Sequence, residues 1–206
     1  DGGFAACAAA GSNPLACGNV GAGAGATVGK LFGSDHAMKG GIGSASVQLQ
    51  GVTVGALVAC NAVGDVLDPH TGQLLAGART AADTLTLRDT QRALLQGDAP
   101  RFALPGTNTT IGIIATDAAL SRTELQRLTV AGHDGLARCI RPVHTMLDGD
   151  TLFALSTGQT SRQPDLITLS AMAAEAVQLA VLCAVRAAQT LRVGDLWLPA
   201  ASERQA

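Results

Sequence analysis

The sequence predicts a layered α/β sandwich, and three observations lead to that prediction. Two groups of apolar strands alternate with helices along the 206 residues. Hydrophobic residues make up 47% and charged residues 15% of the chain, so it is globular and not disordered. Aromatic residues make up only 2%, so Ala, Val, Leu and Ile must build the core. This length suits one domain with a substantial core.

The first half of the chain is expected to contain a helix, a glycine-rich loop and two strands. Residues 4–10 are rich in alanine and are expected to be helical. Glycines are dense over residues 18–43. Residues 44–49 alternate between apolar and polar side chains, which indicates a strand with one buried face. Residues 52–62 are mostly apolar, as expected for a strand that is covered on both faces. Gly51 indicates a tight connection between these strands.

The second half is expected to alternate between helices and strands. Residues 84–96 are predicted to be a helix, and residues 109–118 the central strand. Between them, residues 98–108 form a loop that is exposed enough to be a processing site. Ser121 and Glu124 have the spacing of a capping box, which begins a helix that reaches about residue 140. The remaining predictions are a turn at 68–72, a strand at 151–156, a polar loop at 160–165, a long buried helix at 168–189 and a frayed end at 200–206.

Composition excludes two classes of partner. The formal charge of −2 and the lack of a basic run argue against binding to nucleic-acid phosphates. The scarcity of aromatic residues argues against a base-stacking surface. The longest apolar stretch, residues 169–188, is interrupted by Glu175, Gln178 and Arg186. It is therefore interpreted as a buried helix and not as a membrane span. We expect neither a nucleic-acid nor a membrane partner.

The cysteine pattern indicates a reducing compartment. The five cysteines are widely spaced, odd in number and without a Cys-x-x-Cys pair: Cys7, Cys17, Cys60, Cys139 and Cys183. Free, buried thiols fit this pattern best. No signal peptide is visible, so a cytoplasmic location is expected. The opening Asp1-Gly2-Gly3 resembles sequence from the middle of a domain, so we expect the true start of the gene product to lie upstream.

The glycine-rich loop invites a phosphate-binding interpretation, which its details do not support. In the Walker pattern Ala24 replaces the first glycine, and Leu31 replaces the Ser or Thr that should follow the lysine. Residues 21–26 imitate a dinucleotide fingerprint, but no convincing strand precedes them. The glycines are therefore interpreted as permitting close backbone approach, and no cofactor is expected. Lys30 is a cation in an apolar setting, for which a solvated lysine is the alternative interpretation.

Asn108-Thr109-Thr110, at the start of the predicted central strand, has the most distinctive chemistry. If the bond between Asn108 and Thr109 breaks, Thr109 becomes a chain terminus with a hydroxyl and a free α-amine. An α-amine has an unperturbed pKa of about 7.7–8.0, so it can accept the hydroxyl proton near neutral pH. This pairing is an established route to an activated nucleophile. The alternative is simply the start of a strand rich in β-branched residues.

Other polar side chains lie at predicted element ends. Asn61 ends a buried strand, where it can either donate a hydrogen bond to an oxyanion or form a turn. Asp148 and Asp150 flank a glycine before a strand. With His144 they form a weak candidate metal site. They are alternatively solvated turn residues, or carboxylates that orient a nucleophile. His133, in a predicted helix, is interpreted as a packed or capping residue.

Three stretches together resemble the DmpA-like aminopeptidase family. This family includes L-aminopeptidase/D-esterases, β-peptidyl aminopeptidases and nylon-oligomer hydrolases. The stretches are NTTIGIIATDAAL at 108–120, HDGLARCIRPVHT at 133–145 and DGDTLFAL at 148–155. Weaker support comes from residues 21–30, 40–46 and 58–61. The resemblance covers nearly the whole chain, and the three strong stretches are specific in their order and spacing.

The resemblance implies a four-layer αββα sandwich, similar to N-terminal nucleophile hydrolases, in a protein that cuts its own chain. It places the cut between Asn108 and Thr109. Residues 1–206 then form part of a single domain, in which 1–108 end the α subunit and 109–206 form the β subunit. It also implies that Thr109 is the nucleophile, with its new amine as base.

The resemblance assigns further roles to four residues. Asn61 matches the family's oxyanion-stabilising asparagine. Lys30 matches a lysine of the nylon-oligomer branch, and Asp148 and Asp150 match carboxylates that orient the nucleophile there. The peptidase branches vary at these last three positions. No metal or other cofactor is implied.

The resemblance also implies partners. The expected substrate is a small peptide or amide, and the expected assembly is a tetramer of processed α/β heterodimers. Family precursors have roughly another half-domain before the position of Asp1, which supplies strands and part of the substrate pocket. Two alternative functions stay open. One is an acyltransferase of the ornithine-acetyltransferase type, and the other is an uncleaved, non-catalytic assembly protein with the same fold.

Overall fold

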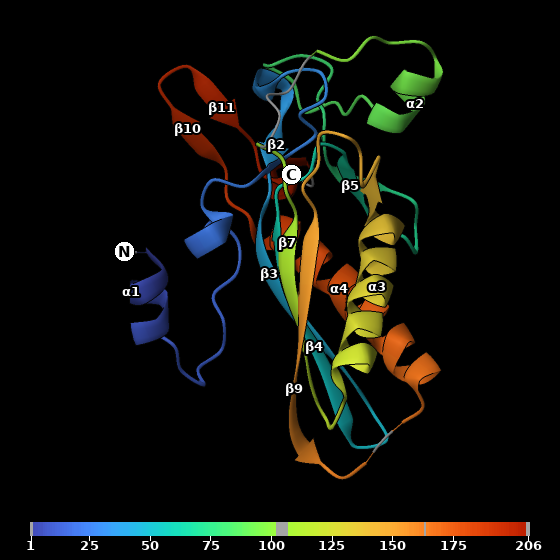
Figure 1. Ribbon diagram of the computed structural model, residues 1–206. Helices are drawn as coiled ribbons and strands as arrows, with labels where there is room; N and C mark the ends of the chain where they lie inside the picture. The colour runs from blue at the N-terminus through green and yellow to red at the C-terminus, as the bar shows by residue number, and fades with distance from the viewer. Residues whose placement is uncertain (1, 102–106, 163, 205–206) are drawn as a thin grey trace.

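A four-stranded sheet forms the centre of the computed structural model, which describes residues 2–101, 107–162 and 164–204 (Figure 1). The strand order is β3-β4-β7-β9. β3 (Gly41–Leu49), β4 (Val52–Cys60) and β7 (Ile111–Ala118) are antiparallel neighbours, and β9 (Thr151–Thr160) runs parallel to β7. The predicted central strand is therefore confirmed, since β7 lies between β4 and β9.

Two helices cover one face of this sheet. α3 (Arg122–Cys139) follows β7, and α4 (Leu166–Ala187) follows β9 (Figure 1). The predicted capping box is present, because Ser121 Oγ accepts a bond from Glu124 N while the Glu124 carboxylate accepts one from Ser121 N. The side chain of Asp165 caps α4 by accepting from Thr168 N, so this helix begins slightly earlier than predicted.

A missing side chain allows α4 to lie close to the sheet. A Cβ atom on Gly43 of β3 would lie 2.2 Å from the Ala180 carbonyl oxygen of α4. Real Cβ atoms do not approach a backbone this closely, so only glycine permits this contact. By length and composition alone α4 is apolar enough to cross a membrane, but 56% of its most apolar window is buried inside the protein. Its packing against β3 and β4 fits the buried helix that the sequence predicts.

The other face of the sheet presents apolar side chains to the outside. Ile111, Phe153 and Leu155 are exposed on this face, and a shallow apolar hollow of about 250 Å³ lies between β3, β4, β7 and β9. Burial alternates along β7, and it also alternates along most of β4. Among the described residues, only one face of β4 is fully covered over its first six residues. The described residues supply one sheet and one helix layer of the predicted sandwich.

Most of the smaller elements lie at one end of the main sheet, at the top of Figure 1. β5 (Asp65–Leu67) pairs with β6 (Leu74–Ala76) and β8 (Ile140–Arg141). β1 (Thr27–Val28) pairs with β2 (Met38–Lys39), and β10 (Leu191–Val193) pairs with β11 (Leu196–Leu198). The remaining helical elements are α1 (Gly2–Ala8), α2 (Thr90–Leu95) and the short 3₁₀ turns Gly21–Gly23, Ser34–His36 and Ala201–Arg204.

Several predicted boundaries are wrong for identifiable reasons. The helix predicted at residues 84–96 begins only at Thr90, because Leu87 bridges to Arg79 and Asp89 has a left-handed backbone. The predicted frayed end is ordered through Arg204, whose guanidinium donates to the Leu74 carbonyl, and residues 205–206 lie outside the described part. All five cysteines are described and free, as predicted, but only Cys60 and Cys139 are buried.

Candidate active site

The predicted site residues come together where β4 ends and β7 and β9 begin. Asn61 directly follows β4, Thr109 precedes β7, and Asp148 and Asp150 precede β9. Because β4 is antiparallel to β7, and β7 is parallel to β9, the end of β4 and the starts of β7 and β9 meet at the same end of the sheet. A parallel bridge between Asn108 and Asp148 extends the β7–β9 ladder into this region.

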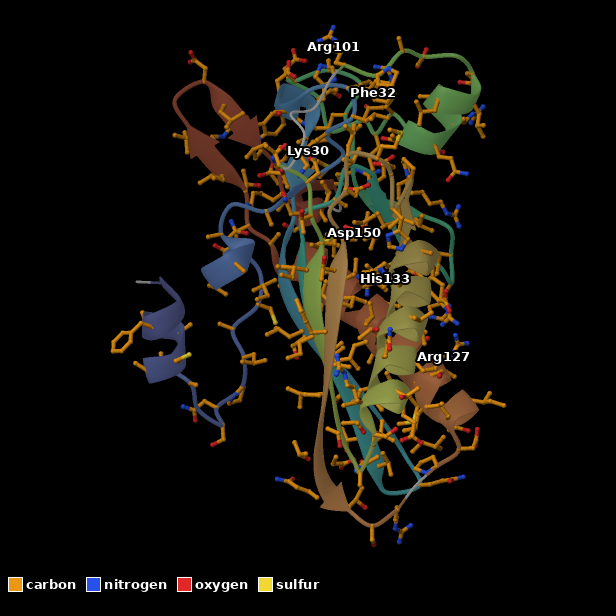
Figure 2. All side chains as sticks on the ribbon, in the orientation of Figure 1. Lys30, Phe32, Arg101, Arg127, His133 and Asp150 are labelled. Carbon is orange, nitrogen blue, oxygen red and sulfur yellow. The ribbon has the colours of Figure 1, made fainter. Side chains whose placement is uncertain are left out.

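Lys30 lies at the same end of the molecule as Asp150 (Figure 2). Its side chain is buried, and the residue is only 6% exposed, so the solvated alternative is wrong. Lys30 Nζ donates to Asn61 Oδ1 at 2.7 Å and to the Asn61 carbonyl at 3.1 Å. Burial lowers the pKa of Lys30 to about 8, although Cys60 and Asp148 oppose the shift. Lys30 can therefore exchange a proton near neutral pH.

The contacts of Asn61 fix the orientation of its amide. Oδ1 accepts from Lys30 Nζ and from Thr27 N at 3.1 Å. Two donors on one atom identify it as the oxygen. Nδ2 therefore faces the Asn108 region, where it donates to the Thr107 carbonyl at 3.0 Å. The structure favours the interpretation of Asn61 as a directed donor over that of a turn-forming residue.

The peptide link between Asn108 and Thr109 is surrounded by hydrogen bonds. Thr109 Oγ1 donates to the Asn108 carbonyl at 2.7 Å, and Gly149 N donates to the same oxygen at 2.9 Å. Thr109 N donates to the Asn61 carbonyl at 3.1 Å. Asn108 itself is fully buried, so the predicted exposure of the loop is wrong at this position. Residues 102–106 of the same predicted loop lie outside the described residues.

Asp150 anchors the residue that follows the candidate nucleophile. Its Oδ1 accepts from Thr110 N at 2.8 Å, and its Oδ2 lies 2.9 Å from His144 Nδ1. The Asp150 side chain is only 4% exposed, so the interpretation as a solvated turn residue is wrong. The ring of His133 lies edge-on to that of His144, with 4.9 Å between the centroids. Burial, and then His144, lower the pKa of His133, which is a packed residue as predicted.

Asp148 stabilises the loop that precedes β9. Its Oδ1 accepts from Val63 N at 3.2 Å, and its Oδ2 accepts from the backbone N and the hydroxyl of Thr145 at 3.0 and 2.7 Å. Its carboxylate therefore fixes the chain on one side of Gly149, while Asp150 fixes it on the other. In the described part of the chain, no group of three or more His, Cys, Asp or Glu side chains could hold a metal ion.

The sequence did not identify two backbone groups of this site. The Gly149 amide and the Thr107 carbonyl both contact the site, but backbone groups leave no signature in side-chain patterns. The available signal for Gly149 was its position between two aspartates. The pairing of His144 with Asp150 had a weak signal in their spacing of six residues.

Comparisons with known proteins identify the family to which the chain belongs. The model of peptidase family S58 matches residues 2–195. An uncharacterised aminopeptidase from Mycobacterium tuberculosis is 45% identical over 195 residues, which are 93% of this chain and 54% of that protein. A 6-aminohexanoate-oligomer endohydrolase from Agromyces sp. is 34% identical over 145 residues, which are 69% of this chain and 40% of that protein. The chain thus spans about half the length, or less, of these curated relatives.

Solved structures agree on the fold. A β-aminopeptidase from Burkholderia sp. superposes with a TM-score of 0.60 at 27% identity, over 95% of this chain and 53% of that one. An L-aminopeptidase D-Ala-esterase/amidase from Ochrobactrum anthropi, described as a variant of the Ntn hydrolase fold, gives a TM-score of 0.62 at 24% identity, over 92% and 51%. The predicted resemblance is confirmed, and the chain belongs to peptidase family S58.

Proposed function

We propose that this chain is part of a self-processing amidohydrolase of the aminopeptidase type. It is cut between Asn108 and Thr109, and Thr109 then hydrolyses amide, peptide or ester bonds near the N-terminal end of a small substrate. The observation that carries the proposal is the contact of the Thr109 hydroxyl with the carbonyl group of its own preceding peptide, at 2.7 Å. Family membership supports the same reaction class.

In the proposed self-cleavage, Thr109 Oγ1 attacks the Asn108 carbonyl carbon. The C–N bond then breaks, and the hydroxyl proton is transferred to the departing nitrogen of Thr109. This N-to-O acyl shift leaves an ester between Asn108 and Thr109, which water hydrolyses to an Asn108 carboxylate and a free Thr109. Lys30 and the Thr109 amide donate to the same carbonyl, that of Asn61, so Lys30 lies beside the nitrogen that leaves.

The burial of the scissile link supports internal attack. Asn108 and Thr110 are both fully buried, and Thr109 is partly buried between them. An external protease needs an exposed, extended segment that it can bind. The Thr109 hydroxyl, in contrast, already contacts the scissile carbonyl group, so an intramolecular attack needs little reorganisation.

In the proposed mature enzyme, the new amine of Thr109 takes the proton from its own hydroxyl. A nearby positive charge on Lys30 disfavours protonation of that amine, and therefore keeps more of it in the basic form. Asn61 Nδ2, which is directed by Lys30 and Thr27, stabilises the oxyanion of the substrate. Losing one such donor typically lowers kcat by about 10²–10³-fold. Asp150 and Asp148 hold the backbone around the nucleophile.

The proposal extends to the whole protein. Two relatives are named as an aminopeptidase and as an oligomer endohydrolase, and both names describe hydrolysis of amide bonds. A small peptide or amide is therefore the proposed substrate. We also propose that residues 1–108 and 109–206 become separate subunits, that a further segment of the precursor completes the sandwich, and that processed heterodimers form a cytoplasmic tetramer.

The test compares Thr109→Ala with Thr109→Ser in the full protein. Thr109→Ala should remain one uncut chain without hydrolysis of aminoacyl p-nitroanilides, whereas Thr109→Ser retains a hydroxyl and should be cut. Denaturing gels and intact mass report the cut, and absorbance reports the turnover. Active, intact Thr109→Ala protein would refute the assignment. An added amine acceptor distinguishes hydrolysis from the acyltransferase alternative.

A further inference from the structure

We propose that the backbone amide of Gly149 is the oxyanion donor for self-cleavage, and that Asn61 fills this role only in the mature enzyme. The inference rests on the proposed self-processing function. It divides the two reactions of one nucleophile between two hydrogen-bond donors. It also explains why the residue between Asp148 and Asp150 has no side chain.

The scissile oxygen already has two hydrogen-bond donors beside it. The Asn108 carbonyl accepts from Thr109 Oγ1 at 2.7 Å and from Gly149 N at 2.9 Å. When Oγ1 bonds to the carbonyl carbon, its proton is transferred to the Thr109 nitrogen and its hydrogen bond to the oxygen is lost. The carbonyl electron pair moves onto the oxygen at the same time. The Gly149 amide then remains as a donor, already at a hydrogen-bond distance from the growing charge.

In the uncut chain, the Asn61 amide is directed at a carbonyl other than the scissile one. Its Nδ2 donates to the carbonyl of Thr107, one peptide before the scissile one, at 3.0 Å. Its Oδ1 is occupied by Lys30 and Thr27, which prevents a simple exchange of the two amide atoms. Asn61 Nδ2 becomes available to a substrate carbonyl once the segment that ends in Asn108 has moved away.

A side chain at position 149 would collide with the Thr109 hydroxyl. A Cβ atom built on Gly149 would lie 2.7 Å from Thr109 Oγ1 and 3.8 Å from Thr109 Cβ. The β-branched side chain of Thr109 has few rotamers, so its hydroxyl cannot easily move aside. Asp150 holds Thr110 N, and Asp148 holds Val63 N, so the backbone cannot easily move either. Glycine at 149 thus leaves the hydroxyl in place and the amide beside the scissile oxygen.

The most direct experiment replaces only the donor. Glycolic acid is incorporated at position 149 of the full protein by cell-free translation, which changes the N–H into an ester oxygen and adds no side chain. Intact mass then follows cleavage with time. We expect self-cleavage to slow by about 10²–10³-fold, the usual effect of losing one oxyanion donor. Hydrolysis at the introduced ester gives different masses and is scored separately. Cleavage within about threefold of wild type would overturn the proposal.

Conventional variants test the steric part. Gly149→Ala should block cleavage, and Gly149→Ala combined with Thr109→Ser should partly restore it, because serine lacks the second branch and its hydroxyl can rotate. Gly55→Ala in β4 is the matched control, since its Cβ would meet nothing closer than 3.7 Å. Unimpeded cleavage of Gly149→Ala would contradict the steric argument, as would failure of serine to restore any cleavage in a variant whose thermal unfolding matches wild type.

A final comparison separates the two donors. In Asn61→Ala, the fold-decrease in substrate turnover should be at least ten times the fold-decrease in the rate of self-cleavage. Equal fold-decreases would overturn the division of roles. The underlying function is tested independently. If wild-type protein is not cut at Thr109, the proposed function fails. If wild type is cut and the glycolate variant is cut equally fast, only the inference about Gly149 fails.

Discussion

Removing the carboxylate of Asp150 should loosen the residue that follows the nucleophile, and the structure allows the size of the effect to be worked out. In Asp150→Ala the buried Thr110 N–H loses its acceptor, which lies at 2.8 Å. An unsatisfied buried donor costs about 1–3 kcal/mol. His144 also loses its partner, but its side chain is 38% exposed and can be hydrated, so this loss adds only about 0–1 kcal/mol. The expected loss in the free energy of unfolding is about 1–4 kcal/mol.

The assay is urea denaturation in a Thr109→Ala background, in which cleavage cannot alter the unfolding transition. Asp150→Asn is the matched control, because its amide oxygen can still accept from Thr110 N, and it should lose about 1 kcal/mol or less. With Thr109 present, Asp150→Ala should also slow self-cleavage more than Asp150→Asn does. If Asp150→Ala were as stable as its parent within about 0.5 kcal/mol, the range of ordinary surface substitutions, the anchoring role would be refuted.

Three further predictions concern buried groups outside this contact. Because the pKa of folded Lys30 is about 8, against 10.5 ordinarily, only the unfolded chain binds this proton between those pH values. The free energy of unfolding of the protein should therefore rise with pH across that window, and urea titrations of Lys30→Met should lack this rise. An equal dependence on pH in wild type and Lys30→Met would contradict the lowered pKa of Lys30. Asp65 accepts three hydrogen bonds in the interior. Asp65→Ala should therefore lower the free energy of unfolding, measured by urea denaturation, by roughly 3–5 kcal/mol, and a decrease under about 1 kcal/mol would be inconsistent with those bonds. Gly43→Ala places Cβ against the backbone of α4, so its free energy of unfolding should fall by at least about 1–3 kcal/mol. The free energy of unfolding of Gly55→Ala should stay within about 0.5 kcal/mol of wild type. Similar thermal unfolding of the two variants would count against the close packing of α4.

The long elements could be predicted because their periodicity and caps are local features. β7 shows alternating burial, and α3 begins at the capping box that Ser121 and Glu124 indicate. The two- and three-residue strands could not be predicted, because pairing between distant segments defines them. β5 is an example, since it pairs with β8 from residues far along the chain.

The candidate site was predictable to the extent that its side chains lie at element ends. Asn61, Asp148 and Asp150 follow or precede strands, and sheet order brings them to one edge beside Thr109. The burial of Lys30 was not predictable, because it depends on a contact with Asn61, 31 residues away. The same holds for the Gly149 amide, whose position depends on the pairing of Asn108 with Asp148.

The most direct test of the account is intact mass together with N-terminal sequencing of purified wild-type protein. We expect a fragment whose first residue is Thr109, formed in protein that has met no added protease and absent from Thr109→Ala. A chain that still joins Asn108 to Thr109 while it hydrolyses amides at full rate would contradict it.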